Sequence, residues 1–256
     1  EFRRVLFRSP AGHFMEVSSA GVKTTCYYEL NAKPSGGRLD YRPAQNRLIE
    51  LLDASVRDRL IADVPLGAFL SGGVDSSVVV ALASRYTNKL KTFSIGYTDN
   101  PFFDETRYAE SVARKFNTDH TVFRLSVSDI ESEVENMLDS LSEPFADSSA
   151  IPLYILAKQT RKYVTVALSG DGGDELFAGY NKHKAEYSVR QNLKFSPLAK
   201  LLLPGLRLFP SSRNAPFSNK VRQARKYLSG LTLSPKDRYW DWAGFLSDQY
   251  ASELCC

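Results

Sequence analysis

Apolar and polar positions follow two different periods between residues 45 and 170. Short runs rich in β-branched and aromatic residues predict strands at 66–70, 91–97, 120–126 and 164–170. Longer segments with apolar residues every three or four positions predict helices at 46–63, from 76 onward, at 105–117, at 128–141 and at about 149–162. Strands separated by helices of this size pair in parallel, so the sequence predicts a doubly wound α/β sheet.

The apolar stripes of three predicted helices identify side chains that we expect to face the core. In chain order they are Leu48, Leu51, Leu52, Val56 and Leu60, then Tyr108, Ala109, Val112 and Phe116, then Ile130, Val134, Met137, Leu138 and Leu141. Ser128 and Glu131 fit an S-x-x-E capping box, which predicts the start of the third helix.

The flanking segments have a different character. Residues 10–30 predict two short strands around a turn at Ala20-Gly21, which are too few to fold alone. Residues 31–38 have the Pro, Gly and Ser content of a linker, and only helices and loops are expected after Gly179. We therefore divide the chain into 1–9, 10–40 and 41–256.

The first nine residues, EFRRVLFRS, do not fit the segment that follows them. One back-translation of RRVLFRS is similar to the tail of a sequencing adapter, so we interpret residues 1–9 as a cloning or assembly artefact. A genuine basic extension is the alternative.

Composition and cysteine usage narrow the class of protein. The 256 residues are 43% hydrophobic and 24% charged, as is ordinary for a globular protein with a sizeable core. Cys26, Cys255 and Cys256 form no CxxC pair and give neither a disulfide framework nor a zinc site, which fits a reducing cytoplasm. No apolar run approaches the roughly 18 residues of a membrane span.

The net charge of +4 conceals a basic segment. Between Tyr187 and Lys236 there are ten basic residues and no acidic one, so the rest of the chain carries 4 − 10 = −6. Sparse aromatic residues and several prolines argue against a nucleic-acid or membrane surface there. A solvated or partner-facing helical region is the favoured interpretation.

Residues 66–77, LGAFLSGGVDSS, have the order strand, glycine loop, helix start. Gly72 and Gly73 can take positive φ, and the free N–H groups of the following helix favour a phosphate. No GK[ST] follows the glycines, so this is not a Walker-type loop. The structural alternative is a glycine turn with Asp75 as an N-terminal cap.

Residues 168–180, LSGDGGDELFAGY, repeat this logic after a later strand and cluster Asp171, Asp174 and Glu175. Ligands of doubly wound sheets lie outside the carboxyl ends of the strands, where the strand order reverses. If the strands ending at Leu70 and Leu168 are neighbours, both loops face one crevice, and Asp75 and Asp174 can share a Mg²⁺. Helix capping is the alternative for this acidic cluster.

Several motifs together resemble one enzyme family. The pattern SGGxDS looks like the pyrophosphate loop of ATP pyrophosphatases. The series DVPLGAFLSGGVDSS, TFSIGY, FDE, EPFADSSAIP and LSGDGGDELFAGY resembles the synthetase domain of glutamine-hydrolysing asparagine synthetases over about residues 45–190. PAGHFMEV is similar to the tail of that family's glutaminase domain. The resemblance implies an adenine nucleotide α-hydrolase-like fold that uses ATP and Mg²⁺.

The resemblance also implies roles for individual residues. Leu70, Ile95, Ser169 and Gly170 would contact adenosine, Ser71, Gly72, Gly73, Asp75 and Ser76 would hold ATP and its pyrophosphate, and Asp147 and Ser148 would line the amino-acid site. Asp171 stands where the family often has Glu and is linked to the acyl-adenylate. Asp75 and Asp174 are the expected metal ligands. His13, His120 and His183 are expected to be structural or surface residues.

The implied reaction adenylates a carboxylate, above all the aspartate side chain, releases pyrophosphate and then uses glutamine-derived ammonia to form asparagine. Cys26 cannot be the N-terminal nucleophile of a glutaminase domain, so we expect this chain to hydrolyse no glutamine. Small-molecule substrates are expected rather than nucleic acid, and a homodimer stays open. The alternatives are another acyl acceptor, as in β-lactam synthetases or sugar and peptide amidotransferases, or a non-catalytic binding module.

Overall fold

The computed structural model describes residues 9–30, 40–99, 104–142, 147–191, 203–206, 209–210, 216–244 and 253. The expected linker at 31–38, all but Ser9 of the expected artefact, and the two terminal cysteines lie outside this set. The chain divides into two compact units, Glu1–Ile49 and Glu50–Cys256. Within the described residues, no helix is both long and apolar enough to cross a membrane.

The first unit contains the predicted hairpin. β1 (His13–Ser18) and β2 (Gly21–Cys26) pair antiparallel from His13↔Cys26 to Ser18↔Gly21. Gly21 adopts a φ of 123°, a conformation that suits glycine at the end of this tight turn. Most side chains of the hairpin are exposed, with Val17 at 75%, so the two strands form no core of their own.

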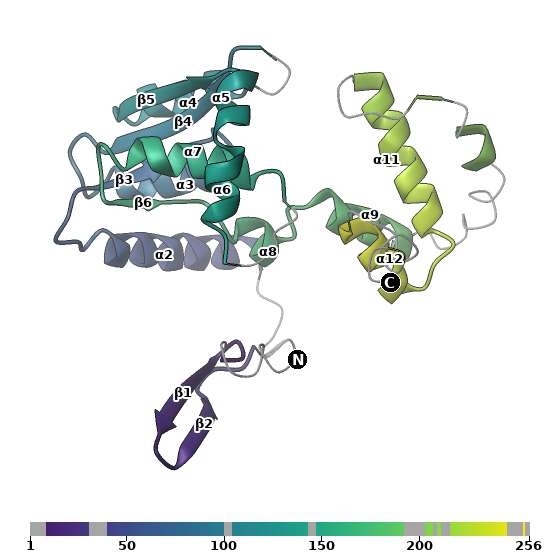
Figure 1. The fold of residues 1–256 in the computed structure, drawn as a ribbon, viewed down its shortest axis with the longest axis horizontal. Helices are drawn as coiled ribbons and strands as arrows, with labels where there is room; N and C mark the ends of the chain where they lie inside the picture. Colours follow the sequence, from purple (N-terminus) through teal and green to yellow (C-terminus); the bar gives the residue numbers. More distant parts are fainter. Residues whose placement is uncertain are drawn as a thin grey trace. The chain divides into compact units, whose positions relative to one another are not determined.

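The second unit is built on the predicted parallel sheet (Figure 1). Its strands are β3 (Leu66–Phe69), β4 (Lys91–Tyr97), β5 (Asp119–Leu125) and β6 (Val166–Leu168), in the order β5-β4-β3-β6. The chain starts in the interior of the sheet at β3, moves outward to β4 and β5, and then places β6 on the other side of β3. The strand order therefore reverses between β3 and β6, which confirms the doubly wound fold class.

Helices cover both faces of the sheet. α2 (Tyr41–Arg59), α3 (Val74–Ala83) and α4 (Thr106–Lys115) share one buried apolar cluster with β3, in which Ala68, Val80 and Ala109 are fully buried. On the other face, which α7 (Ala150–Thr160) covers, Phe93 stacks on Phe123 with ring centroids 6.1 Å apart. Burial of this apolar surface on two sides is the main force that holds the sheet in place.

Four residues predicted to face the core are exposed. Leu48, Leu51 and Tyr108 are 37%, 51% and 50% exposed. The side chains of these two helices that pack in the buried cluster are Leu52, Val56 and Leu60 of α2, and Ala109, Val112 and Ala113 of α4. Leu138 is also exposed at 54%.

The capping box lies two residues earlier than predicted. The helix expected at 128–141 is divided into α5 (Val127–Ser132) and α6 (Val134–Asp139). Because β5 ends at Leu125, Ser126 keeps an extended backbone and caps α5, and its hydroxyl accepts from the Asp129 N–H at 3.2 Å. The Asp129 carboxylate accepts in return from the Ser126 N–H at 2.7 Å. Ser128 lies inside the helix, where it cannot be the N-cap.

After β6 the described residues form helices and loops, as predicted for the part after Gly179. They include α8 (Gly173–Phe177), α9 (Asn181–Gln191), α11 (Pro216–Gly230) and α12 (Pro235–Ala243).

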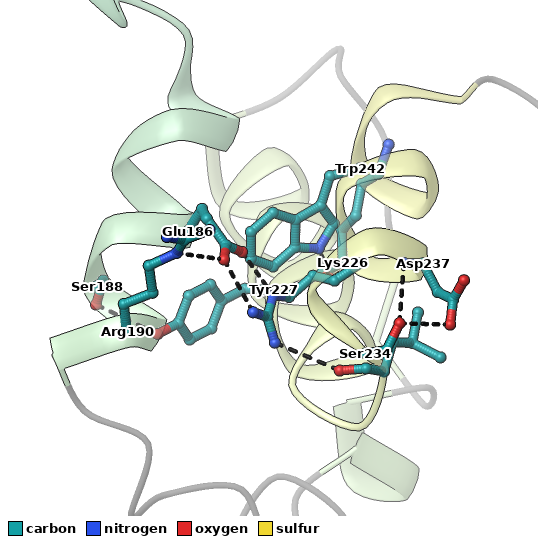
Figure 2. Close-up of polar contacts among 10 residues, drawn as sticks. Glu186, Ser188, Arg190, Lys226, Tyr227, Ser234, Asp237 and Trp242 are labelled. Atoms are coloured by element: carbon teal, nitrogen blue, oxygen red, sulfur yellow. Dashed lines mark hydrogen bonds and ion pairs between the residues drawn. The ribbon is translucent and has the colours of Figure 1, made fainter. Parts of the chain in front are cut away.

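An ion pair joins α9 to α12 (Figure 2). The guanidinium of Arg238, whose side chain is 4% exposed, donates to both carboxylate oxygens of Glu186 at 2.7 and 3.0 Å. This hydrogen bonding from Arg238 lowers the pKa of Glu186 to about 2. Tyr227 of α11 stacks on Trp242 of α12, with ring centroids 6.0 Å apart. These contacts join the three helices to one another.

Candidate active site

The first loop begins where β3 ends and turns directly into α3. Gly73 is the N-cap of the helix, and its N–H donates to the Ser71 hydroxyl at 3.2 Å. The Ser71 and Ser76 hydroxyls are hydrogen-bonded at 3.0 Å, and Ser77 donates to the Gly73 carbonyl at 2.6 Å. These serine hydrogen bonds fix the conformation of the loop. The first N–H groups of α3, which have no partner within the helix, lie beyond the carboxyl end of β3.

Gly72 serves the packing of this loop. Its φ is +83°, and a Cβ at this position would lie 2.5 Å from the backbone nitrogen of Ala109 and 2.5 Å from the Cβ of Tyr108. Gly72 is not among the residues that line the pocket described below. The glycine lets the loop lie against α4.

The second loop follows β6. The Ser169 hydroxyl donates to the Asp171 carboxylate at 2.8 Å, and Gly172, with a φ of 90°, precedes the first residue of α8. Asp174 and Glu175 lie in the first turn of that helix. Ala178, with a φ of 54°, ends the helix, and the Gly179 N–H donates to the Asp174 carbonyl at 3.0 Å.

The two loops are in direct contact because β3 and β6 are neighbours, with Ala68 paired to Leu168. A Cβ on Gly170 would lie 2.6 Å from the backbone nitrogen of Ser76. A Cβ on Gly173 would lie 2.5 Å from Cγ of Asp75. Glycines therefore allow the acidic loop to lie against the start of α3. Because the strands ending at the two loops are neighbours, both loops face one crevice, as the sequence predicts for this case.

A cavity of about 1050 Å³ opens between these loops. It is lined by Phe69, Leu70, Ser71, Gly73, Asp75, Ser76, Phe93, Ser94, Ile95, Tyr97, Glu105, Val127, Ile130, Ser148, Ile151, Pro152, Leu153, Leu156, Ser169 through Glu175, and Tyr180. Its volume reaches the upper end of the range for small-molecule sites. One side of the lining is apolar, from β4, α5 and α7, and the other consists of the two polar loops.

Negative charge dominates the electrostatics of the cavity. The described lining residues include five carboxylates, Asp75, Glu105, Asp171, Asp174 and Glu175, and no Lys, Arg or His. An anionic ligand such as a nucleotide therefore needs cations with it to enter this lining.

Hydrogen bonds sort the carboxylates of the two loops into two groups. Asp171 accepts from Ser169, and Glu175 accepts from the Tyr180 hydroxyl at 2.6 Å. Among the described residues, no side chain donates a hydrogen bond to Asp75 or Asp174. No group of three or more His, Cys, Asp and Glu side chains suited to a metal occurs in the described part of the chain. Two carboxylates fit Mg²⁺, which completes its shell with phosphate oxygens and water.

Most of the sequence-predicted site residues meet at this cavity, and two do not line it. Leu70, Ser71, Gly73, Asp75, Ser76, Ile95, Ser148, Ser169, Gly170, Asp171 and Asp174 line it. Gly72 packs on α4, and Asp147 accepts from the Ser149 N–H at 2.9 Å at the start of α7. That backbone hydrogen bond lowers the pKa of Asp147.

Sequence reasoning missed part of the wall, including Tyr97, Glu105, Tyr180 and the Ile151–Leu156 side of α7. A signal for Tyr97 was present, because Phe93, Ile95 and Tyr97 alternate along β4 and must share one face. α7 is apolar along most of its length, so its sequence gave no sign of which side faces a ligand.

The three histidines do not line this cavity. His120 bridges Thr92 and Ser94 on β4 through its two ring nitrogens, at 2.9 and 3.2 Å. Burial lowers the pKa of His120.

Comparison with known proteins gives a consistent family match. A family model described as asparagine synthase matches residues 47–250. A relative in Methanocaldococcus jannaschii is 43% identical over 158 residues, which are 59% of this chain and 30% of that protein. Asparagine synthetase (glutamine-hydrolyzing) 1 of Bacillus subtilis is 35% identical over 199 residues, which are 76% of this chain and 30% of that protein. The chain thus spans about 30% of the length of these relatives.

Two solved structures match this chain at low similarity. NMN synthetase from Francisella tularensis has a TM-score of 0.40 and 15% identity, with 80% of this chain and 93% of that chain covered. NH3-dependent NAD synthetase from Campylobacter jejuni has a TM-score of 0.36 and 13% identity, with 77% and 98% covered. Both scores are too low to add to the strand order described above.

Proposed function

This chain belongs to the asparagine synthase family, and we propose that its two-loop cavity binds ATP with Mg²⁺ and activates a carboxylate by adenylation. The observation that supports this most is the contact of the two loops at the strand-order reversal, which brings Asp75 and Asp174 to one cavity. The cavity combines a helix N-terminus that can bind phosphates, two carboxylates that can bind a cation, and apolar walls that can bind a nucleobase.

In this proposal the first loop holds the pyrophosphate part of ATP. Ser71, Gly73 and Ser76 form a hydrogen-bonded turn at the start of α3, and the N-terminal N–H groups of this helix would face the phosphates. Leu70 and Ile95, with Ser169 and Gly170, line the side assigned to adenosine. Such preset donors stabilise charge that develops on phosphate oxygens without any reorganisation during the reaction.

Asp75 and Asp174 would hold the Mg²⁺, and their carboxylates fit it because no described side chain donates a hydrogen bond to them. When bound, Mg²⁺ supplies positive charge to the leaving pyrophosphate. Asp171, oriented by the Ser169 hydroxyl, would be the carboxylate linked to the acyl-adenylate.

The proposed reaction has two steps. A substrate carboxylate, above all the aspartate side chain, attacks the α-phosphorus of ATP, and pyrophosphate leaves. Ammonia from glutamine then attacks the acyl carbon, and AMP leaves with formation of asparagine. No described residue is needed as a nucleophile. We propose that a glutaminase domain of the full-length protein supplies the ammonia, to which the hairpin at 13–26 would belong.

An exchange assay with several acceptors tests the identity of the acyl substrate. The full-length protein should catalyse exchange of labelled pyrophosphate into ATP with aspartate, at a rate about 100-fold or more above that with other carboxylic acids, because recognition of a substrate's polar groups gives discrimination of this size. Exchange with a β-amino acid derivative or a peptide carboxylate in place of aspartate would instead favour the alternative acceptors of the same chemistry.

A further inference from the structure

The acidic loop folds back on itself so that two of its residues face each other. Ala178 and Gly179 reverse the chain after α8, and Tyr180 then donates its hydroxyl to Glu175 at 2.6 Å. Both Glu175 and Tyr180 line the cavity. This pair takes no part in the proposed metal or pyrophosphate binding, which leaves its purpose open.

The Tyr180 ring is held on several sides. The Lys182 ammonium lies 4.9 Å from the centre of this ring and 5.2 Å from that of Tyr239, and His183 contacts the Tyr180 ring edge-on at 5.5 Å. A cation above an aromatic face and an edge-on ring both restrict the phenol. The hydroxyl therefore points at Glu175 from a fixed position.

The Glu175 carboxylate faces the cavity and can accept more hydrogen bonds than the one it receives from Tyr180 at 2.6 Å. Among the described residues, no other side chain donates a hydrogen bond to this carboxylate. A carboxylate has about four lone-pair sites, so further donors can bind to it.

From this geometry we propose that Glu175, positioned by Tyr180, binds the α-ammonium group of the acyl acceptor, so that the cavity selects amino acids over carboxylic acids without an amino group. The proposal rests on the proposed function. In this proposal Asp75 and Asp174 bind the cation, whereas Glu175 accepts a hydrogen bond from the uncharged Tyr180 hydroxyl and binds the substrate. Ser148, on the chain that leads into α7, lines the same cavity.

Steady-state exchange kinetics of the full-length protein test this proposal with aspartate and with succinate, which lacks the amino group. Glu175→Gln should raise the KM for aspartate about 10- to 100-fold, as expected for loss of a hydrogen bond to a charged group, and leave the KM for ATP unchanged. Tyr180→Phe, which removes only the hydroxyl, should raise the KM for aspartate about 3- to 10-fold. Both variants should narrow the preference for aspartate over succinate.

Matched changes outside the cavity serve as controls. Glu135→Gln on α6 and Tyr187→Phe on α9 alter exposed side chains and should behave as wild type. A higher KM for ATP or a shifted Mg²⁺ requirement in Glu175→Gln, with the aspartate to succinate ratio retained, would overturn the proposal and assign Glu175 to the metal. A wild-type protein without any carboxylate-dependent exchange would overturn the proposed function, and this inference with it. If Glu175→Gln does not fold, the aspartate to succinate preference of Tyr180→Phe tests the proposal in its place.

Discussion

Replacing Asp75 with asparagine is expected to reduce aspartate-dependent pyrophosphate exchange at least about 100-fold. Asp75 lies in the first turn of α3 and lines the cavity, and its carboxyl carbon would be 2.5 Å from a Cβ on Gly173 of the acidic loop. Asparagine keeps the shape of the side chain and removes its charge, so a bound cation loses one of its two proposed carboxylates. The measurement is the initial exchange rate of the full-length protein at saturating ATP.

Folding should be nearly unaffected by this change. Loss of a charge at a helix N-terminus costs about 0.3–1 kcal/mol, which is small beside the loss of activity. Asp139→Asn, at an exposed position on α6, makes the same chemical change away from the cavity and should retain wild-type exchange. Wild-type exchange rates in Asp75→Asn would contradict the proposed role of Asp75 as a metal ligand.

The second large effect is expected for Gly170→Ala, which should both destabilise the protein and lower exchange at least about 10-fold. A Cβ at residue 170 would lie 2.6 Å from the backbone nitrogen of Ser76 and 2.9 Å from the carbonyl carbon of Asp75. These are backbone atoms, so relief requires the two loops to separate. Overpacking of this kind costs about 1–3 kcal/mol in the free energy of unfolding.

Thermal unfolding and exchange should be measured together for this variant. A loss of about 1–3 kcal/mol corresponds to a melting temperature lower by roughly 2–12 °C in a protein of this size. Gly205→Ala is the matched control, because a Cβ there would meet no atom within 4 Å. An unchanged melting temperature together with full exchange in Gly170→Ala would contradict the close contact of the two loops.

The sheet could be predicted from the sequence because local patterns determine it. Each strand is a short apolar run between helices with an apolar stripe, and the run KTFSIGY matches β4 at 91–97 exactly in its bounds. The adjacency of β3 and β6 could only be stated as a condition, since pairing between segments about 100 residues apart leaves no local pattern.

The details that the sequence did not predict depend on tertiary packing. Ser126 rather than Ser128 caps α5 because β5 ends one residue before it. Leu51 has the right spacing for a core face, yet no described element covers it well enough to bury it. Tyr180 enters the cavity wall only because the chain reverses at Ala178 and Gly179, which depends on a left-handed turn rather than on periodicity.

The candidate site was predictable in outline for a different reason. Its two loops combine glycines, serines and acids directly after strands, and such residue types at the carboxyl end of a parallel sheet indicate phosphate and metal chemistry. The roles of the individual residues in the two loops stay proposals, and they depend on one claim, that the cavity binds ATP together with Mg²⁺.

Equilibrium dialysis of the full-length protein against labelled ATP, with Mg²⁺ and with EDTA, tests that claim most directly. Because the described lining carries five carboxylates and no basic side chain, we expect saturable binding at one site per chain with Mg²⁺ and at least about tenfold weaker binding without it. Absence of saturable ATP binding in the presence of Mg²⁺, or equal binding in EDTA, would contradict the account.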